Sequence, residues 1–127
     1  MEPRKKRILV IEDDWEMRSL LEDYLEEEGY AVGSAKDGSE AFRKLAKESF
    51  DLIITDIRMP GLNGLEILPG LRQIQSGIPI IVITAFGSEE VQRRALTRGA
   101  DAYLEKPLHL DQLRALIQEM VSSRGKG

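Results

Sequence analysis

Short, uninterrupted runs of apolar residues recur along the chain and predict buried β-strands. Four stand out, at residues 8–11, 52–54, 80–83 and 102–104, and most of their residues are β-branched. A strand that is buried on both faces of a parallel sheet shows such a run, whereas a half-exposed strand alternates apolar and polar residues. The less hydrophobic segment 30–35 predicts a fifth strand at an edge of the sheet.

Apolar residues at helical spacing separate these runs. In an amphipathic helix they recur every third or fourth position, and glycine is favoured just after the last turn. A capping residue followed by acids favours the first turn. We predict one helix through Met17, Leu20, Leu21, Tyr24 and Leu25 up to Gly29, one opening at the capping box Asp37 and Glu40 with Ala41, Phe42, Leu45 and Ala46 buried, one from Ser88 to Gly99, and one through Leu110, Leu113, Leu116, Ile117 and Met120.

A further helix is expected after Gly64, but Pro69 falls inside its pattern. Proline lacks the N–H donor, and its ring clashes with the preceding turn. We therefore expect this helix to be kinked at Pro69 or to begin later.

Alternating strands and helices predict an α/β domain of the (βα)₅ type with right-handed crossovers. The turn after the first strand, Glu12-Asp13-Asp14, lacks the glycines of a dinucleotide-binding fold. This favours a doubly wound, flavodoxin-like sheet with the strand order 2-1-3-4-5. We predict one domain over residues 1–121, and a flexible tail or the start of a linker at residues 122–127.

The composition fits one folded domain and excludes several kinds of chemistry. The chain has 127 residues, 42% of them hydrophobic, no cysteine and a single histidine, His109. Cysteine-ligated metal sites, cysteine nucleophiles and multi-histidine metal sites are therefore excluded. No segment resembles a signal peptide or a membrane span, so we expect a soluble, cytoplasmic protein without membrane contacts.

The net charge of −4 is unevenly distributed. Residues 11–30 carry nine acids and one base, Arg18, so their balance is −8 and the rest of the chain carries +4. The other bases are scattered among acids rather than gathered on one face. Direct nucleic-acid binding by this chain is therefore not expected.

Polar residues follow the predicted strands. In an open parallel sheet, ligands bind beyond the carboxyl ends of the strands, where the strand order reverses. The order 2-1-3-4-5 makes the first and third strands neighbours at that point and so brings Glu12, Asp13 and Asp56 together. Thr84 and Lys106 follow the fourth and fifth strands and join the same edge.

Each of these residues also has an ordinary structural explanation. Acids at a helix start cap the helix, which is how we interpret Asp14, while Asp56 suits a turn and Lys106 a surface position. Their meeting at one edge is not explained in this way. Crowded carboxylates suit Mg²⁺, which lets an anionic phosphoryl group approach an attacking Asp oxygen, with Lys106 and Thr84 contacting the phosphoryl oxygens.

Together these residues resemble the receiver domain of two-component response regulators, which has a CheY-like fold. The resemblance covers nearly the whole chain, and its motifs are residues 8–14, Asp-Ile-Arg-Met-Pro-Gly at 56–61, Asn-Gly at 63–64, Ile-Thr-Ala at 83–85 and Gly-Ala-Asp-Ala-Tyr-Leu-Glu-Lys-Pro at 99–107. It implies that Asp56 is the phosphoacceptor and that Glu12 and Asp13 form an acidic pair. Mg²⁺ would be held by Asp13, Asp56 and the backbone carbonyl of Arg58, beside Glu12.

The resemblance also assigns roles at the fourth and fifth strands. Lys106 would contact the phosphoryl group, and the Lys106–Pro107 bond would be cis. Thr84 and Tyr103 would form a switch pair that changes the face made by the fourth helix, fifth strand and fifth helix. Trp15, beside the acidic turn, is expected to report metal binding through its fluorescence.

Some positions depart from the family's usual pattern. Glu12 stands where Asp is commoner, which is expected to alter metal affinity. Arg58 and Phe86 occupy positions that tend to govern access of hydrolytic water, and their size predicts slow loss of the phosphoryl group. Asp101 is followed by Ala102 rather than by a second acid, so the dimer salt bridges of the branch with winged-helix outputs are not assumed.

The expected function is a phosphorylation-activated switch that accepts a phosphoryl group from a histidine kinase or phosphotransfer protein. The switch would control an output domain or a target protein. Whether it forms a phosphorylation-dependent homodimer is left open. Such a domain is not an enzyme with an external substrate, because it catalyses only its own phosphorylation and dephosphorylation. A haloacid-dehalogenase-type phosphotransferase would need a second Asp at the position of Arg58. A phosphorylation-independent interaction module would usually have lost Asp56, Lys106 or the acidic pair.

Overall fold

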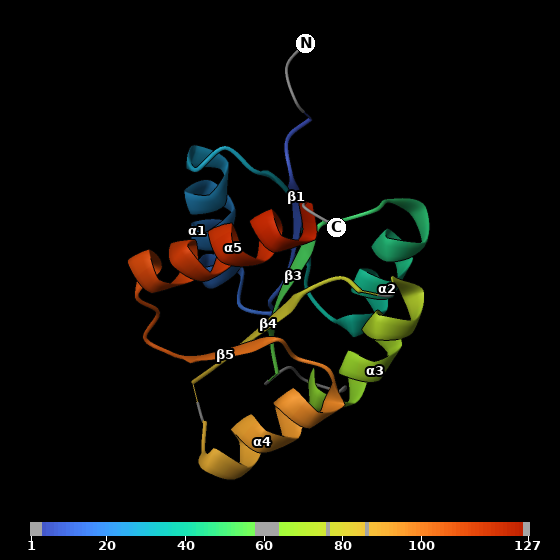
Figure 1. Ribbon diagram of the computed structural model, residues 1–127, viewed down its shortest axis with the longest axis vertical. Coiled ribbons are helices and arrows are strands. Elements are labelled where there is room, and N and C mark those ends of the chain that lie inside the picture. The colour runs from blue at the N-terminus through green and yellow to red at the C-terminus, as the bar shows by residue number, and fades with distance from the viewer. Residues whose placement is uncertain (1–3, 58–63, 76, 86, 126–127) are drawn as a thin grey trace.

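The computed structural model describes residues 4–57, 64–75, 77–85 and 87–125. Within them, strands and helices alternate from β1 to α5 (Figure 1). The elements in chain order are β1 (Arg7–Ile11), α1 (Trp15–Glu27), β2 (Ala31–Ala35), α2 (Gly38–Lys47), β3 (Leu52–Asp56), α3 (Gly64–Ile74), β4 (Ile80–Thr84), α4 (Glu89–Arg98), β5 (Ala102–Glu105) and α5 (Leu110–Gly125).

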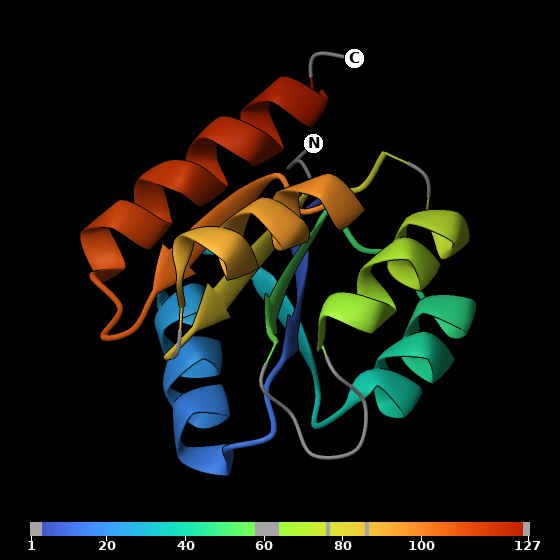
Figure 2. The ribbon, with the colours of Figure 1, turned by 90° about the horizontal axis from the view of Figure 1, so that it is seen from below.

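The sheet is parallel, and its strand order is β2-β1-β3-β4-β5, which confirms the predicted flavodoxin-like order. β2, the least hydrophobic of the predicted strands, lies at one edge. Helices α1 and α5 cover one face of the sheet, and α2, α3 and α4 cover the other (Figure 1, Figure 2). Because the strands are parallel, their carboxyl ends meet at one edge, and β1 and β3 are neighbours there.

Each face of the sheet has its own apolar core, because successive strand residues point to opposite faces. Leu9 and Ile11 of β1 pack into the core that includes residues of α2, α3 and α4. Ile8 and Val10 pack into the core that includes residues of α1 and α5. Burial on both faces explains why β1, β3 and β4 show uninterrupted apolar runs in the sequence.

The predicted capping residues are found at the helix ends. Asp14 caps α1 by accepting from the Glu16 N–H, and Ser88 caps α4 by accepting from the Val91 N–H at 3.1 Å. After α1, Gly29 has a φ of 97°, in the left-handed region that glycine adopts readily. These contacts satisfy backbone groups that a helix end otherwise leaves without partners.

Three details differ from the sequence predictions. α3 begins at Gly64 and contains Pro69, so the later start, one of the two predicted effects, is wrong, while a kink at Pro69 stays a prediction; the proline is exposed. Ala46 was predicted to be buried on α2, but it is exposed. α5 continues to Gly125, so residues 122–125 of the expected tail are helical, because extending an established helix is easy.

The boundary between the domain and a linker stays a prediction.

In the described part of the chain, no helix has both the length and the apolar character needed to cross a membrane.

Candidate functional site

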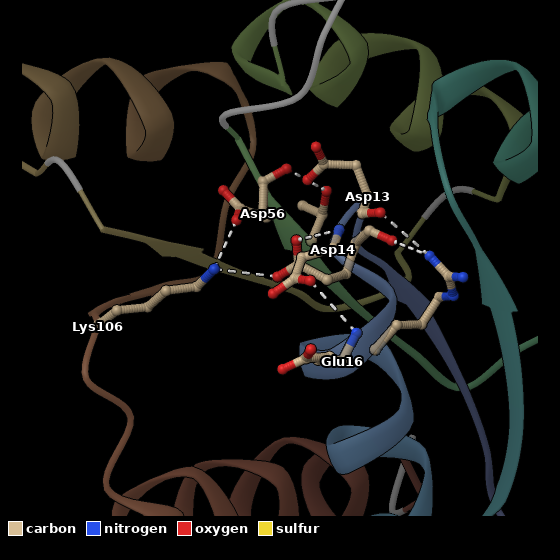
Figure 3. A network of polar contacts seen from close by, with 8 residues as sticks. Asp13, Asp14, Glu16, Asp56 and Lys106 are labelled. Carbon is tan, nitrogen blue, oxygen red and sulfur yellow. Dashed lines mark hydrogen bonds and ion pairs between the residues drawn. The ribbon is translucent and has the colours of Figure 1, made fainter.

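The carboxylates of Glu12, Asp13 and Asp56 gather at the carboxyl edge of the sheet. Glu12 and Asp13 directly follow β1, and Asp56 is the last residue of β3. One oxygen from each of the three lies within 4.8 Å of the other two. Figure 3 shows Asp13 and Asp56 close together, with Asp14 below them in this view, at the start of α1.

Lys106, which follows β5, bridges two of these acids. Its Nζ donates to Oδ2 of Asp56 at 2.8 Å and to Oε1 of Glu12 at 3.1 Å (Figure 3). Glu12 and Asp56 are 1% and 4% exposed, so both ion pairs lie largely out of water. The ammonium therefore neutralises part of the charge that two buried carboxylates bring together.

This crowding changes the proton affinities of Glu12 and Lys106. Burial, followed by the charge of Asp56, raises the pKa of Glu12 from 4.5 to about 7, although Lys106 acts in the opposite direction. Burial alone would lower the pKa of Lys106, but its hydrogen bonds to Asp56 and Glu12 raise it above its ordinary value. Lys106 is thus held in its charged form, whereas its ammonium only partly compensates the cost of a charge on the buried Glu12 carboxylate.

The turn between β1 and α1 is held by contacts that sequence reasoning did not identify. The N–H of Asp14 donates to Oε2 of Glu12 at 3.2 Å. Nη1 of Arg18 donates to the carbonyl of Glu12 at 2.8 Å. In β3, the buried hydroxyl of Thr55 donates to the carbonyl of Asp56 at 3.1 Å. The only signal for Arg18 was its position as the single base among nine acids.

Thr84 and Tyr103 lie on adjacent strands of the same half of the sheet. Thr84 ends β4 and is fully buried, and its carbonyl accepts from the Lys106 N–H at 2.8 Å. The hydroxyl oxygen of Tyr103 is also buried, and it makes no hydrogen bond with any other described residue. Burial, and then Glu105, raises the pKa of this hydroxyl, although the backbone of Ser88 faces it closely enough to act in the opposite direction.

Gly87, which precedes α4, lies directly against Tyr103. A Cβ at Gly87 would lie 1.9 Å from the Tyr103 hydroxyl. Only glycine therefore fits position 87 while the ring keeps this orientation.

The remaining predictions at the site have different outcomes. The Lys106–Pro107 peptide bond is cis, as the resemblance implied. Trp15 begins α1 and is 64% exposed, which suits its use as a fluorescent reporter. Arg58 and Phe86 lie outside the described residues, so their predicted roles stay predictions.

The acidic cluster fits a divalent cation. The three carboxylates, when ionised, and the one ammonium leave two negative charges, which one Mg²⁺ balances. Asp13 is exposed, so an ion bound there can keep several waters, as Mg²⁺ does. A cation would also relieve the repulsion that contributes to the raised pKa of Glu12. Glu12, Asp13 and Asp56 are therefore the residues that would hold it.

Residues 8–118 match the family model described as "Response regulator receiver domain". Response regulator MprA of Mycolicibacterium vanbaalenii is 39% identical over 125 residues, which cover 95% of this chain and 54% of that protein. Transcriptional activator protein PfeR of Pseudomonas aeruginosa is 39% identical over 109 residues, which cover 86% of this chain and 35% of that protein. The chain thus spans about a third to a half of the length of these relatives.

Solved structures show the same likeness over nearly their full length. A CheY-like response regulator receiver domain protein from Methanospirillum hungatei superposes with a TM-score of 0.92 and 33% identity, covering 97% of this chain and 98% of the other. Response regulator TrrA from Thermotoga maritima, solved in complex with Mg²⁺-BeF, has a TM-score of 0.81 and 36% identity, covering 91% and 98%. The likeness thus extends to a relative whose structure contains Mg²⁺.

Proposed function

This chain belongs to the response regulator receiver domains of two-component systems, and we propose that it is a phosphorylation-activated switch whose phosphoacceptor is Asp56. One observation carries this proposal. Asp56 stands at the carboxyl end of β3, within hydrogen-bonding distance of the half-buried Lys106 and within 4.8 Å of two further carboxylates. This arrangement combines a nucleophile, a fixed positive charge and a set of metal ligands.

The proposed reaction transfers a phosphoryl group from a phosphohistidine of a histidine kinase or phosphotransfer protein. An oxygen of the Asp56 carboxylate attacks phosphorus, and the new O–P bond forms as the P–N bond breaks. The imidazole leaves with the electron pair and takes up a proton. The product is an acyl phosphate on Asp56. No external substrate is turned over, so the domain catalyses only its own phosphorylation and dephosphorylation.

The chain's own residues supply positioning and charge. Mg²⁺, when bound at the acidic cluster, neutralises phosphoryl oxygens and so lets an anion approach these acids. The Lys106 ammonium already lies 2.8 Å from the Asp56 carboxylate. When a carboxylate oxygen bonds to phosphorus, the carboxylate loses its charge, and the ammonium would then bind an oxygen of the phosphoryl group instead. The hydroxyl of Thr84, at the end of the next strand, is the proposed contact for another oxygen.

Thr84 and Tyr103 are proposed to carry the signal away from Asp56. A backbone hydrogen bond joins the Thr84 carbonyl to the N–H of Lys106, so the phosphoryl-binding lysine and this threonine are physically linked. The Tyr103 hydroxyl lies buried against Gly87, in the loop that follows β4. A shift of Thr84 toward a phosphoryl group would move that loop, and with it the space available to the Tyr103 ring.

The proposed output surface is formed by α4, β5 and α5. A groove of about 440 Å³ extends from Lys106 and Tyr103 to Gln92 of α4 and Gln112 of α5. The groove therefore connects the phosphoryl-binding lysine with this surface. An output domain, a separate target protein or a second copy of this chain is the proposed partner here, in the cytoplasm, where ATP supplies the kinase.

Labelling with a small acyl phosphate tests the proposal directly. We expect the wild-type protein to gain one phosphoryl group in the presence of Mg²⁺, detected by intact mass, and to lose it on treatment with hydroxylamine, which cleaves acyl phosphates. Chelation of Mg²⁺ should abolish labelling, and so should Asp56→Asn.

Asp23→Asn is the matched control, because Asp23 is an exposed acid of α1. This variant should label like the wild type. Labelling of Asp56→Asn at the wild-type level, or a label that resists hydroxylamine, would contradict the proposal.

A further inference from the structure

Arg18 contacts three successive carbonyls of the turn that presents the acidic pair. It lies in the first turns of α1, and its Nη1 donates to the carbonyl of Glu12 at 2.8 Å and to that of Asp13 at 3.4 Å. Its backbone N–H donates to the carbonyl of Asp14 at 2.9 Å. One residue thus holds the backbone of the turn Glu12-Asp13-Asp14.

The partners of Arg18 are unexpected for a base in so acidic a segment. Residues 11–30 contain nine acids and no other base. Within the described part of the chain, however, the Arg18 guanidinium pairs with no carboxylate and binds backbone carbonyls instead. A surface ion pair does not explain this geometry, whereas a role in shaping the turn does.

Asp13 is the acid that depends most on this support. Glu12 is held by Lys106 and by the Asp14 N–H. The Asp13 carboxylate is exposed and makes no hydrogen bond or ion pair with any other described residue. Its direction toward Asp56 is therefore set by its own backbone, which Arg18 holds at the carbonyl (Figure 3).

We propose that Arg18 is a positioning residue for divalent-cation binding: by holding the carbonyls of Glu12 and Asp13 it keeps the Asp13 carboxylate directed at the cation site beside Asp56. The inference rests on the proposed function, because it concerns the metal that phosphoryl transfer requires. It extends that function by assigning metal affinity in part to a residue that would not touch the metal. Residues that orient metal ligands typically change affinity by about tenfold to a hundredfold when they are replaced.

Charge alone predicts the opposite effect. Arg18 is a cation close to a cation site, so removing its charge should tighten Mg²⁺ binding if it acted only through electrostatics. Removing its hydrogen bonds should weaken Mg²⁺ binding if it acts by positioning. The direction of the change therefore separates the two explanations.

The experiment compares Mg²⁺ dissociation constants of the wild type, Arg18→Met and Arg18→Lys. The constants are measured by Trp15 fluorescence and independently by calorimetry. Arg18→Met should weaken binding by about tenfold. Arg18→Lys keeps the positive charge but has a single nitrogen in place of the planar guanidinium. Its Mg²⁺ dissociation constant should therefore lie between those of the wild type and Arg18→Met. Hydrogen exchange of the metal-free protein should be faster at the amides of residues 13–16 in Arg18→Met.

Two control variants exclude general effects. Arg43→Met removes an exposed arginine of α2 and should bind Mg²⁺ like the wild type. Val121→Ala removes apolar contacts of α5 and should lower the melting temperature without changing the dissociation constant. If Arg18→Met proves unstable, Arg18→Lys still tests the proposal, because it differs from the wild type in geometry and not in charge.

The possible results separate the failure of this inference from that of the proposed function. Unchanged or tighter Mg²⁺ binding by both Arg18 variants, with a wild type that binds Mg²⁺, would overturn the inference alone. A loss of affinity that Val121→Ala reproduces would also overturn it. A wild type that binds no Mg²⁺ would overturn both.

Discussion

At the scale of single residues, Glu12 is the group whose chemistry its surroundings change most. Its side chain is 1% exposed and contacts Lys106 and the Asp14 N–H. Burial, and then the charge of Asp56, raises its pKa to about 7, so near neutral pH it is divided between protonated and ionised forms. Mg²⁺ requires the ionised form, and a proton therefore competes with the cation.

We expect Mg²⁺ affinity to fall as the pH is lowered through the pKa of Glu12, by up to about tenfold per pH unit below about 7. Without a cation, the free energy of unfolding should decrease as the pH rises from 4.5 to about 7, because the folded protein holds this proton more tightly than the unfolded chain. Mg²⁺ titrations followed by Trp15 fluorescence measure the first effect, and urea unfolding at several pH values measures the second.

Glu12→Gln is the control, since its amide does not titrate. This variant should bind Mg²⁺ more weakly than the wild type, with little pH dependence near neutrality. A wild-type affinity that stays constant between about pH 6 and pH 8 would be inconsistent with the raised pKa.

At the scale of elements, Arg72 of α3 joins four segments. Its Nη2 donates to the Gly99 carbonyl at 2.7 Å and to Oδ2 of Asp101 at 2.6 Å, and its Nη1 donates to the Ile78 carbonyl at 2.8 Å. The same Asp101 oxygen accepts from the Ile80 N–H at 2.8 Å. Arg72 therefore ties α3 to the end of α4 and to the beginnings of β4 and β5.

Replacing Arg72 should weaken the whole fold. Arg72→Met removes charge-assisted hydrogen bonds from a half-buried position, so the free energy of unfolding in urea should fall by about 2–3 kcal/mol. Arg114→Met is the matched control, because the Arg114 side chain on α5 is more exposed than that of Arg72; it should cost less than about 1 kcal/mol. Equal losses in the two variants would show that the Arg72 contacts add nothing beyond a surface arginine.

The comparison of sequence with structure shows which elements could be predicted. β1, β3 and β4 are buried on both faces, so each left an uninterrupted apolar run that the sequence displays. The contacts of Arg72 left no such pattern, because two of its acceptors are backbone carbonyls and its partners Gly99 and Asp101 lie 27 and 29 residues away. Pro69 left two possibilities for α3, a kink or a later start, and the sequence did not decide between them; the helix begins at Gly64.

At the scale of the whole molecule, the candidate site exists only because the sheet brings distant residues together. Lys106 is separated by 94 residues from Glu12 and by 50 from Asp56, yet it binds both. These residues could be predicted because the strand order and the strand ends together place them at one edge. Burial, the pKa of Glu12 and the part played by Arg18 could not, because they depend on distances that no sequence pattern encodes.

Lys106 links this site to the stability of the whole molecule. Its ammonium forms ion pairs with both Glu12 and Asp56. Its loss would remove this positive charge from beside the carboxylates of Glu12, Asp13 and Asp56, which lie close together. The carboxylates would then repel one another in the folded state and be relieved by unfolding.

We expect Lys106→Met, in the presence of a chelator near pH 8, to lower the free energy of unfolding by about 2–3 kcal/mol. Mg²⁺ should reduce this loss of stability. The site of Lys106→Met carries one more negative charge than that of the wild type, so it should bind Mg²⁺ more tightly. At a given Mg²⁺ concentration, tighter binding stabilises the folded protein more. Urea unfolding with and without Mg²⁺ measures both effects. Lys47→Met, which alters an exposed lysine of α2, should change neither. If Mg²⁺ stabilises Lys106→Met no more than the wild type, carboxylate repulsion does not account for the deficit, and Lys106 supports the fold by packing alone.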